Sequence, residues 1–217
     1  MLNISKVSKL DGIRSWSLQA GDTCPGAFNR DGSFVDACNG CYARGGRYHG
    51  ENVKKPRREN RQDWKSEDWV SRMISALGKE KYFRWFDSGD MYSVSLAEKM
   101  YQVMASLPNT QFWLPTRMYK FAKFQNVLNR MNALPNVMVR YSSDSIIGEY
   151  VKGVHGSTIV PDSDNVPNGV SLCGAYQNDG KCGGCRNCWD KSIAVIGYPI
   201  HGATAKKNLR IKLALVA

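Results

Sequence analysis

Apolar residues recur at helical spacing in three stretches of the chain, residues 64–78, 95–107 and 119–134. In the second stretch, for example, Leu96, Met100 and Val103 are three or four positions apart. Side chains at that spacing lie on one face of a helix, so the pattern predicts three amphipathic helices. Residues 21–62 lack this pattern and are rich in glycine and charge, which predicts a long loop before the first helix.

Short apolar runs separate these helices and are predicted to be strands. They are residues 15–20, 82–86, 111–115, 137–141, 157–160 and 193–198. Strands that alternate with amphipathic helices are joined by crossover connections, which give a mostly parallel sheet. The sequence therefore predicts an α/β fold of about six strands, either a partial or complete barrel or an open α/β sheet.

The whole chain, residues 1–217, is predicted to form a single domain, because no internal repeat or low-complexity linker interrupts it. Its barrel core spans residues 15–160 and includes a first cysteine loop. Residues 170–192 form a second, cysteine-rich segment. Basic and other residues alternate in residues 206–212, which indicates a last strand or a loose arm.

Composition and charge restrict the setting in which the protein works. The chain has 42% hydrophobic and 23% charged residues, which is typical of soluble globular proteins. No apolar run approaches the ~20 residues needed to cross a bilayer, and the first residues lack the apolar stretch of a secretory signal. We therefore expect a cytoplasmic protein that has no membrane partner.

The net charge of +11 favours an anionic partner, either nucleic acid, a phosphorylated cofactor or an acidic protein. Surplus lysine can equally serve solubility alone. The densest basic run, residues 54–58, could contact phosphates, and the alternative is a solvated loop that leads into a helix.

The seven cysteines carry the strongest chemical signal. An odd number cannot pair completely in disulfides, and clustered thiols in a reducing compartment are typical of metal ligands. Cys38 and Cys41 form a C-x2-C pair, and Cys24 can fold back toward them across a glycine-containing loop. Three thiolates can bind three irons of a four-iron, four-sulfur (4Fe–4S) cluster and leave the fourth iron open to another ligand.

A second group of cysteines lies near the end of the chain and comprises Cys173, Cys182, Cys185 and Cys188. The C-x2-C-x2-C run of its last three members is similar to the run that wraps a ferredoxin cluster. Zinc is the alternative metal for this quartet, although structural zinc more often uses two separate C-x2-C pairs. Cys173 stands apart from the run and could instead complete the first site.

Polar clusters follow four of the predicted strands. They are the Cys24 loop, the run Asp87-Ser88-Gly89-Asp90, the pair Thr116-Arg117 and the run Ser142-Ser143-Asp144. In parallel α/β folds the functional loops gather at the carboxyl ends of the strands. We therefore expect these clusters to surround one site.

Together, the motifs around Cys24, Cys38 and Cys41, the run Trp85-Phe86-Asp87-Ser88-Gly89-Asp90 and the late cluster that ends at Cys188-Trp189-Asp190 resemble the phage gene product 88 family. The resemblance spans residues 16–198, and that family in turn looks like a compact relative of the radical S-adenosylmethionine (radical SAM) proteins. For a phage-encoded protein the expected compartment becomes the host cytoplasm.

The radical SAM likeness implies a partial (β/α)6 barrel of the TIM type and two iron–sulfur clusters. The cluster at Cys24, Cys38 and Cys41 would bind S-adenosylmethionine and cleave it reductively, and the late quartet would hold an auxiliary cluster. Asp87, Ser88, Gly89 and Asp90 would contact the methionine amino group, and Arg117 would pair with a carboxylate. The chain departs from the usual C-x3-C-x2-C motif, because its first gap is longer and Gly40 takes the usual aromatic position.

Three functions follow as hypotheses. The first is a small radical SAM-like enzyme, whose substrate stays open. The second is a non-catalytic iron–sulfur protein that transfers electrons or binds a host protein or nucleic acid. The third is a zinc-stabilised nucleic-acid-binding module. Cleavage of S-adenosylmethionine separates the first from the second, and metal content separates both from the third.

Overall fold

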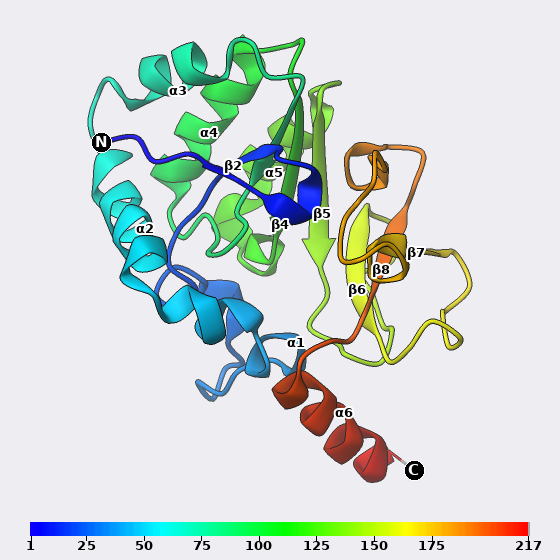
Figure 1. The fold of residues 1–217 in the computed structure, drawn as a ribbon. Helices are drawn as coiled ribbons and strands as arrows, with labels where there is room; N and C mark the ends of the chain where they lie inside the picture. Colours follow the sequence, from blue (N-terminus) through cyan, green and yellow to red (C-terminus); the bar gives the residue numbers. More distant parts are fainter. Residues whose placement is uncertain (217) are drawn as a thin grey trace.

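The computed structural model describes residues 1–216 and shows a mixed α/β protein built on one sheet of eight strands (Figure 1). The strands are β1 (Ser5–Lys6), β2 (Arg14–Trp16), β3 (Tyr82–Trp85), β4 (Gln111–Thr116), β5 (Val137–Ser142), β6 (Gly156–Val160), β7 (Val170–Leu172) and β8 (Val195–Pro199). The six α-helices of the described chain are α1 (Asp36–Asn39), α2 (Glu51–Asp63), α3 (Trp69–Leu77), α4 (Val94–Ser106), α5 (Gln125–Ala133) and α6 (Ala203–Val216).

The strands lie in the order β1-β2-β3-β4-β5-β6-β8-β7, and every pair except the antiparallel β1–β2 is parallel. The predicted mostly parallel sheet is therefore confirmed. A closed barrel is not, since β1 and β7 remain the two edges of the sheet within residues 1–216. The order from β2 to β6 follows the chain, as right-handed crossovers produce when consecutive strands are added at one edge.

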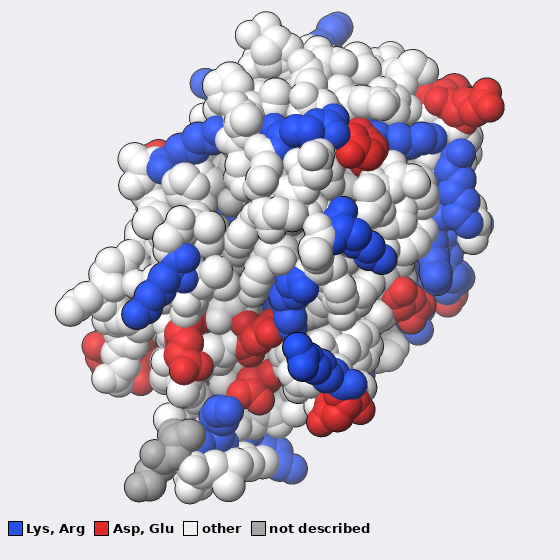
Figure 2. Space-filling view, turned by 180° about the vertical axis from the view of Figure 1, so that it is seen from behind, with Lys and Arg blue, Asp and Glu red and all other residues white. Residues whose placement is uncertain are grey.

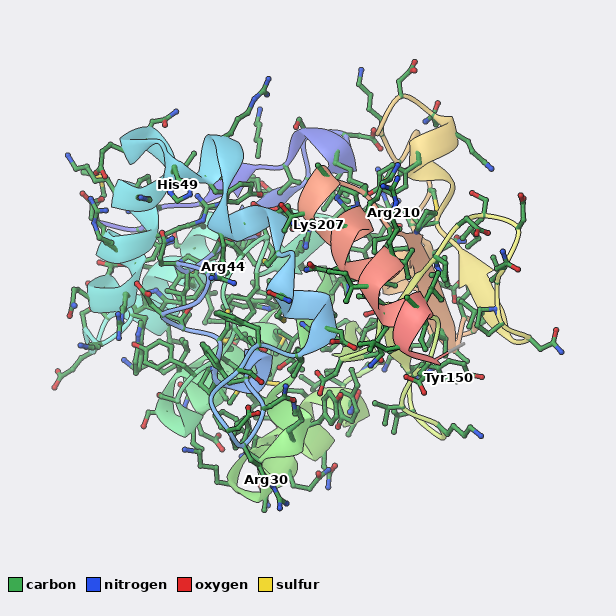
Figure 3. All side chains as sticks on the ribbon, turned by 90° about the horizontal axis from the view of Figure 1, so that it is seen from below. Arg30, Arg44, His49, Tyr150, Lys207 and Arg210 are labelled. Carbon is green, nitrogen blue, oxygen red and sulfur yellow. The ribbon has the colours of Figure 1, made fainter. Side chains whose placement is uncertain are left out.

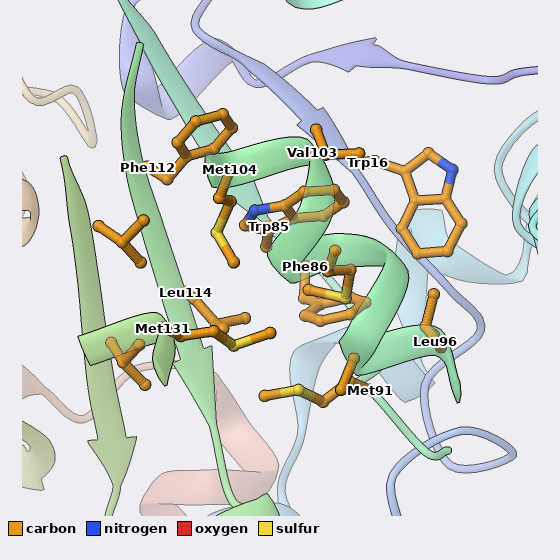
Figure 4. Packing of buried hydrophobic residues seen from close by; sticks show 14 of the residues in the cluster. Trp16, Trp85, Phe86, Met91, Leu96, Val103, Met104, Phe112, Leu114 and Met131 are labelled. Atoms are coloured by element: carbon orange, nitrogen blue, oxygen red, sulfur yellow. The ribbon is translucent and has the colours of Figure 1, made fainter. Parts of the chain in front are cut away.

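One face of the sheet packs against α3, α4 and α5 and holds the main hydrophobic core. Its strand residues alternate with those of the other face, as the two-residue period of a strand requires. Figure 4 shows Phe112 and Trp85 from neighbouring strands beside Met104 of α4, with Trp16 of the next strand on the far side of Trp85. This core fixes the positions of the strand ends.

The other face is covered by the cysteine-rich segment. Trp189 of that segment packs with Leu10, Trp113 and Met138 in a second apolar cluster. The Trp189 indole N–H donates to the carbonyl oxygen of Phe83 at 3.0 Å, so the segment is pinned to the backbone of β3. The predicted 170–192 segment is thus part of the packed domain.

Two segments that the sequence did not predict to be helical are helices in the structure. Residues 51–63 form α2, although Pro56 lies inside it. The sequence predicted a loop here because the residues are rich in glycine and charge and lack apolar periodicity, and a proline removes one backbone hydrogen bond of a helix. The predicted strand or loose arm at residues 206–212 is part of α6, which lies with α1 at the carboxyl ends of the strands (Figure 1).

Candidate functional site

A cavity of about 350 Å³ lies at the carboxyl ends of the parallel strands. In α/β proteins this end of the sheet is where ligands bind. All four predicted polar clusters contribute to its wall, as do Arg84 of β3 and His201 before α6. Six of the seven cysteines also line it: Cys24, Cys38, Cys41, Cys173, Cys182 and Cys188. The structure thus brings both predicted cysteine groups to one cavity.

The loop after β2 folds back on itself and carries the first three cysteines. The Val35 N–H donates to the carbonyl oxygen of Ala27 at 3.0 Å, which returns the chain toward Cys24. Cys38 then lies in the short helix α1, and the Cys41 N–H donates to the Cys38 carbonyl oxygen at 3.2 Å. The side chains of Ala27, Val35 and Cys38 form a small apolar cluster with Cys24 against it.

Burial makes the free thiols of Cys24 and Cys38 weaker acids than an ordinary cysteine. It raises the pKa of Cys24 to about 12, and the charge of Asp90 and the neighbouring thiolates of Cys38 and Cys41 act in the same direction. The pKa of Cys38 is also raised by burial, whereas the guanidinium of Arg117 opposes that change. A bound metal would reverse this balance, because a cation stabilises the thiolate.

The quartet lies on the cysteine-rich segment, which covers the inner face of the sheet, the face opposite α3, α4 and α5. The Cys182 N–H donates to the Lys9 carbonyl oxygen at 2.8 Å, and the backbone N–H groups of Gly183 and Gly184 donate to Asp11. Both glycines have a positive φ, which the tight turn between Cys182 and Cys185 requires. The segment is therefore tied to the first residues of the chain.

The quartet thiols differ in exposure. Cys188 lies with its Sγ 3.4 Å from the Tyr198 hydroxyl, and burial raises its pKa to about 11. Cys173, at the end of β7, and Cys182 line the cavity with it. Cys185 is exposed and lies outside the cavity wall.

The described side chains do not form a ready-made site for one metal ion. Within residues 1–216, no three cysteine, histidine or acidic side chains come close enough together to hold a single ion. The cysteines nevertheless share a cavity. The charges of Cys38 and Cys41 raise the pKa of Cys24, and the charge of Cys173 raises the pKa of Cys188. The metal-ligand assignment of all seven cysteines therefore stays a prediction.

Asp87 and Ser88, at the end of β3, line the cavity and also join two other parts of the chain. The Asp87 carboxylate accepts hydrogen bonds from Tyr48 at 2.7 Å and from Arg57 at 3.0 Å. Ser88 donates its hydroxyl to the Leu18 carbonyl oxygen at 2.7 Å. These residues hold α2 and the loop after β2 against the sheet.

Gly89 has a φ of +81° and a close neighbour. A Cβ atom on this residue would lie 2.6 Å from the Cβ of Leu18 and 2.8 Å from the Thr23 hydroxyl oxygen. The position therefore requires glycine for its backbone conformation and for space. It lets the loop after β2 pass directly over the end of β3.

Asp90 is buried and accepts three hydrogen bonds. They come from the Thr116 hydroxyl at 2.8 Å and from the backbone N–H groups of Met91 and Arg117 at 2.8 and 2.9 Å. Burial nevertheless raises the pKa of Asp90 to about 6, so its charge is poorly solvated despite these donors.

Arg117 is already engaged by this chain's own acceptors. Its guanidinium donates to Asp144 at 3.2 Å and to the Ser143 carbonyl oxygen at 2.7 Å. Gly26 packs against it so tightly that a Cβ there would lie 2.5 Å from the Arg117 Cβ. Arg117 thus supports the loop that begins at Cys24, and a ligand carboxylate would share it with Asp144.

Aromatic residues connect the two cysteine groups across the cavity, which the sequence pattern did not predict. The ring of His201 lies 6.1 Å from that of Tyr42 and 5.0 Å from that of Tyr176. Its Nδ1 is 2.6 Å from the Tyr176 hydroxyl. Tyr42 directly follows Cys41, and Tyr176 follows Cys173 by three positions, so proximity to cysteines is the one signal that could have indicated them.

The basic run of residues 54–58 lies on α2, and part of it faces inward. Arg57 pairs with Asp87 and is largely buried, whereas Arg58 pairs with Glu51 on the surface. On the back of the molecule, basic and acidic side chains are interspersed (Figure 2). A ligand for the net positive charge therefore stays a prediction.

None of the helices within residues 1–216 is both long and apolar enough to span a bilayer.

The fold and the cavity define an α/β protein with a cysteine-lined site at the carboxyl ends of its strands. The family model described as gene product 88 matches residues 3–208, nearly the whole chain. The chain therefore belongs to the gene product 88 family, as its motifs indicated. Searches of curated proteins and of solved structures gave no match. The radical SAM likeness thus rests on the motifs alone.

Proposed function

We propose that this chain is an iron–sulfur protein with two cluster sites that open onto one cavity. Cys24, Cys38 and Cys41 would hold a 4Fe–4S cluster, and the late quartet would hold a second. The supporting observation is that six thiols from the two ends of the sequence line the same cavity at the carboxyl ends of the strands.

The donor set suits clusters better than a single zinc ion. In a cubane each thiolate binds a different iron, so the sulfur atoms stand farther apart than they do around one ion. The described thiols share a cavity without converging on a point. Three thiolates at the first site would leave one iron open to another ligand, and the cavity that these thiols line is large enough for a small molecule.

The cavity wall beside the first site also suits a radical SAM-like activity. A reduced cluster there would supply the electron that cleaves S-adenosylmethionine. Asp87 and Asp90 are two acidic wall residues that could accept a hydrogen bond from the methionine amino group, and both already accept hydrogen bonds within the chain. Arg117 would orient the carboxylate while it remains paired with Asp144.

The alternative is a non-catalytic iron–sulfur protein that transfers electrons or binds a partner. The exposed Cys185 favours it for the second site, because a cluster partly open to solvent is accessible to a redox partner. Zinc in the quartet is the further alternative.

Anaerobic purification followed by iron, sulfide and zinc analysis tests the proposal. We expect iron and sulfide for two clusters, and an electron paramagnetic resonance spectrum of the reduced protein that changes when S-adenosylmethionine is added. Formation of 5′-deoxyadenosine would establish the enzyme, and two clusters without it would favour the non-catalytic protein. Zinc with no iron would exclude both.

Cysteine variants separate the two sites. We expect the triple substitution Cys24→Ala, Cys38→Ala and Cys41→Ala to remove one cluster and the response to S-adenosylmethionine. The matched triple substitution Cys173→Ala, Cys182→Ala and Cys188→Ala should remove the other cluster and keep that response. Equal loss of all iron from both variants would mean that the seven cysteines serve one centre.

A further inference from the structure

Arg84 on β3 places a guanidinium in the cavity between the two cysteine groups. Its side chain is 14% exposed, and its positive charge is close enough to the side chains of Tyr42 and Cys188 to interact with them. The guanidinium stacks on the Trp113 ring at 4.6 Å from the ring centre. Its Nε is buried and has no hydrogen-bond partner among the residues that the structure describes.

Arg140 shows what a purely structural arginine looks like on the same face of the sheet. It lies on the next strand but one, is fully buried, and donates hydrogen bonds to six backbone carbonyl groups. Those acceptors use the donors of its guanidinium. Arg84 is slightly more exposed and lacks such a set, so its Nε–H is left for something that enters the cavity.

The charge around Arg84 is not balanced by the chain. Its ion-pair partner is Asp87, with Nη1 3.7 Å from the carboxylate oxygen, and Arg57 holds that same carboxylate at 3.0 Å. Two arginines thus share one acid. Of the other acidic wall residues, Asp36 pairs with Lys212, and Asp90 accepts hydrogen bonds from the Thr116 hydroxyl and from the backbone N–H of Arg117. One positive charge therefore remains uncompensated in the cavity, where it attracts an anion.

The geometry points to an anion-binding subsite in which Arg84 holds the carboxylate or phosphate group of a small molecule. The forked guanidinium suits either group, because it can donate two parallel hydrogen bonds. The rings of Trp113 and Tyr198 form the adjacent wall, and Lys9 adds a second positive charge to it. This subsite uses the cavity of the proposed function, but it depends on no metal.

Titration calorimetry on the anaerobically purified full chain tests this subsite. Inorganic phosphate and acetate serve as separate probes, which distinguish phosphoryl from carboxylate binding. We expect one saturable site for at least one probe and at least about tenfold weaker binding in Arg84→Gln, since charge-assisted hydrogen bonds are lost. Arg84→Lys keeps the charge without the fork, so its affinity should lie between the two.

Arg30→Gln is the matched control, because Arg30 is exposed at the same end of the molecule (Figure 3). Its affinity should stay within about twofold of the original chain. Circular dichroism verifies that each variant is folded. Unchanged affinity in Arg84→Gln and Arg84→Lys, or no saturable binding of either anion by the original chain, would refute the subsite.

Iron and sulfide contents measured on the same samples keep the two proposals separate. Arg84-dependent anion binding by a chain without iron would leave the subsite standing and refute the clusters. Two clusters together with unchanged anion affinity in the Arg84 variants would support the clusters and refute the subsite.

Discussion

The two cysteine regions are held in place by different physical means. The loop of Cys24, Cys38 and Cys41 rests on small apolar contacts and on a network of charged side chains at the strand ends. The late segment is fastened by one buried arginine, Arg140, and by Trp189 on the inner face of the sheet. The first region depends on ionisation, whereas the second depends on buried backbone hydrogen bonds.

This difference implies different sensitivities. The network around Asp90 responds to pH, because its central carboxyl titrates with a pKa of about 6. The Arg140 network contains only carbonyl acceptors, which do not titrate, so its contribution should be nearly constant near neutral pH. Single substitutions can test whether the Asp90 network and the Arg140 network stabilise their regions independently.

The largest effect is expected for Arg140→Met. The substitution removes the guanidinium donors from six carbonyl groups. Those of Asn187, Asp190 and Ala194 keep a backbone N–H donor, and each acceptor that is left unsatisfied costs about 1–3 kcal/mol before relaxation. We expect a loss of about 5 kcal/mol in the free energy of unfolding, measured by urea denaturation. Arg130→Met, at a surface pair with Glu98, should lose less than about 1 kcal/mol. Similar losses in both variants would contradict the role of Arg140.

Gly89→Ala should come next and act on the first region. The added Cβ collides with Leu18, and the alanine must adopt the positive φ of Gly89. We therefore expect a loss of about 3 kcal/mol in the free energy of unfolding. Gly32→Ala is the control, since Gly32 has a φ of +83° but no atom within 4 Å of the added carbon. It should lose only about 1 kcal/mol. Equal losses would mean that conformation alone, and not the Leu18 contact, matters at position 89.

Asp90→Asn should sharpen the pH contrast. Burial raises the pKa of Asp90 from 3.8 to about 6, so the folded state binds a proton that the unfolded state has lost between these pH values. The contribution of Asp90 to stability is therefore fully present below about pH 4 and declines as the pH rises through about 6. Relative to the original chain, Asp90→Asn should gain about 2–3 kcal/mol of stability between pH 4 and 7.

Urea denaturation at several pH values measures that difference. Asp162→Asn provides a control of opposite sign, because hydrogen bonds from Asn165 lower the pKa of the exposed Asp162. The stabilisation by Asp162 is lost as the pH falls through its pKa. A stability difference between the original chain and Asp90→Asn that does not change with pH would show that the first region has no titrating support.

The smallest effect is expected for Lys212→Ala. Lys212 of α6 pairs with Asp36 of α1 at 2.9 Å, and both side chains are more than a third exposed. Exposed pairs contribute little, so we expect less than about 1 kcal/mol, reduced further by salt. Chemical denaturation at low and high salt measures it. A larger, salt-independent loss would show that α6 is held to the first cysteine region mainly by this pair.

The sequence pattern predicted the regular part of the fold well. The core strands and amphipathic helices were recognisable because one face of each is apolar, and that face is buried in the structure. The short strands β1 and β7 were missed because two or three residues carry no periodic signal. Helix α2 was missed because Pro56 and a row of charges are untypical of a helix interior.

The candidate site was predictable only where residues stand close in sequence or follow a strand. The Cys24 loop and the Asp87–Asp90 run each follow a strand, and in the structure both line one cavity together with the late cysteines. Arg84 belongs to no sequence motif, and its unsatisfied Nε could not be foreseen, since it depends on which acceptors come near in space. His201 likewise looked isolated in the sequence and lies between Tyr42 and Tyr176 only after folding.

The contact between Gly40 and Ala205 makes the residue type allowed in the first cysteine loop depend on the last helix of the chain. A Cβ on residue 40 would lie 2.8 Å from the Ala205 Cα, so no side chain fits at position 40 while α6 is in place. The aromatic ring that radical SAM motifs carry at this position is thus sterically forbidden here, and Tyr42 stands one step beyond Cys41 instead. Positions 40 and 205 should accordingly coevolve, and bulk acquired at one should be accompanied by a displaced or shortened final helix.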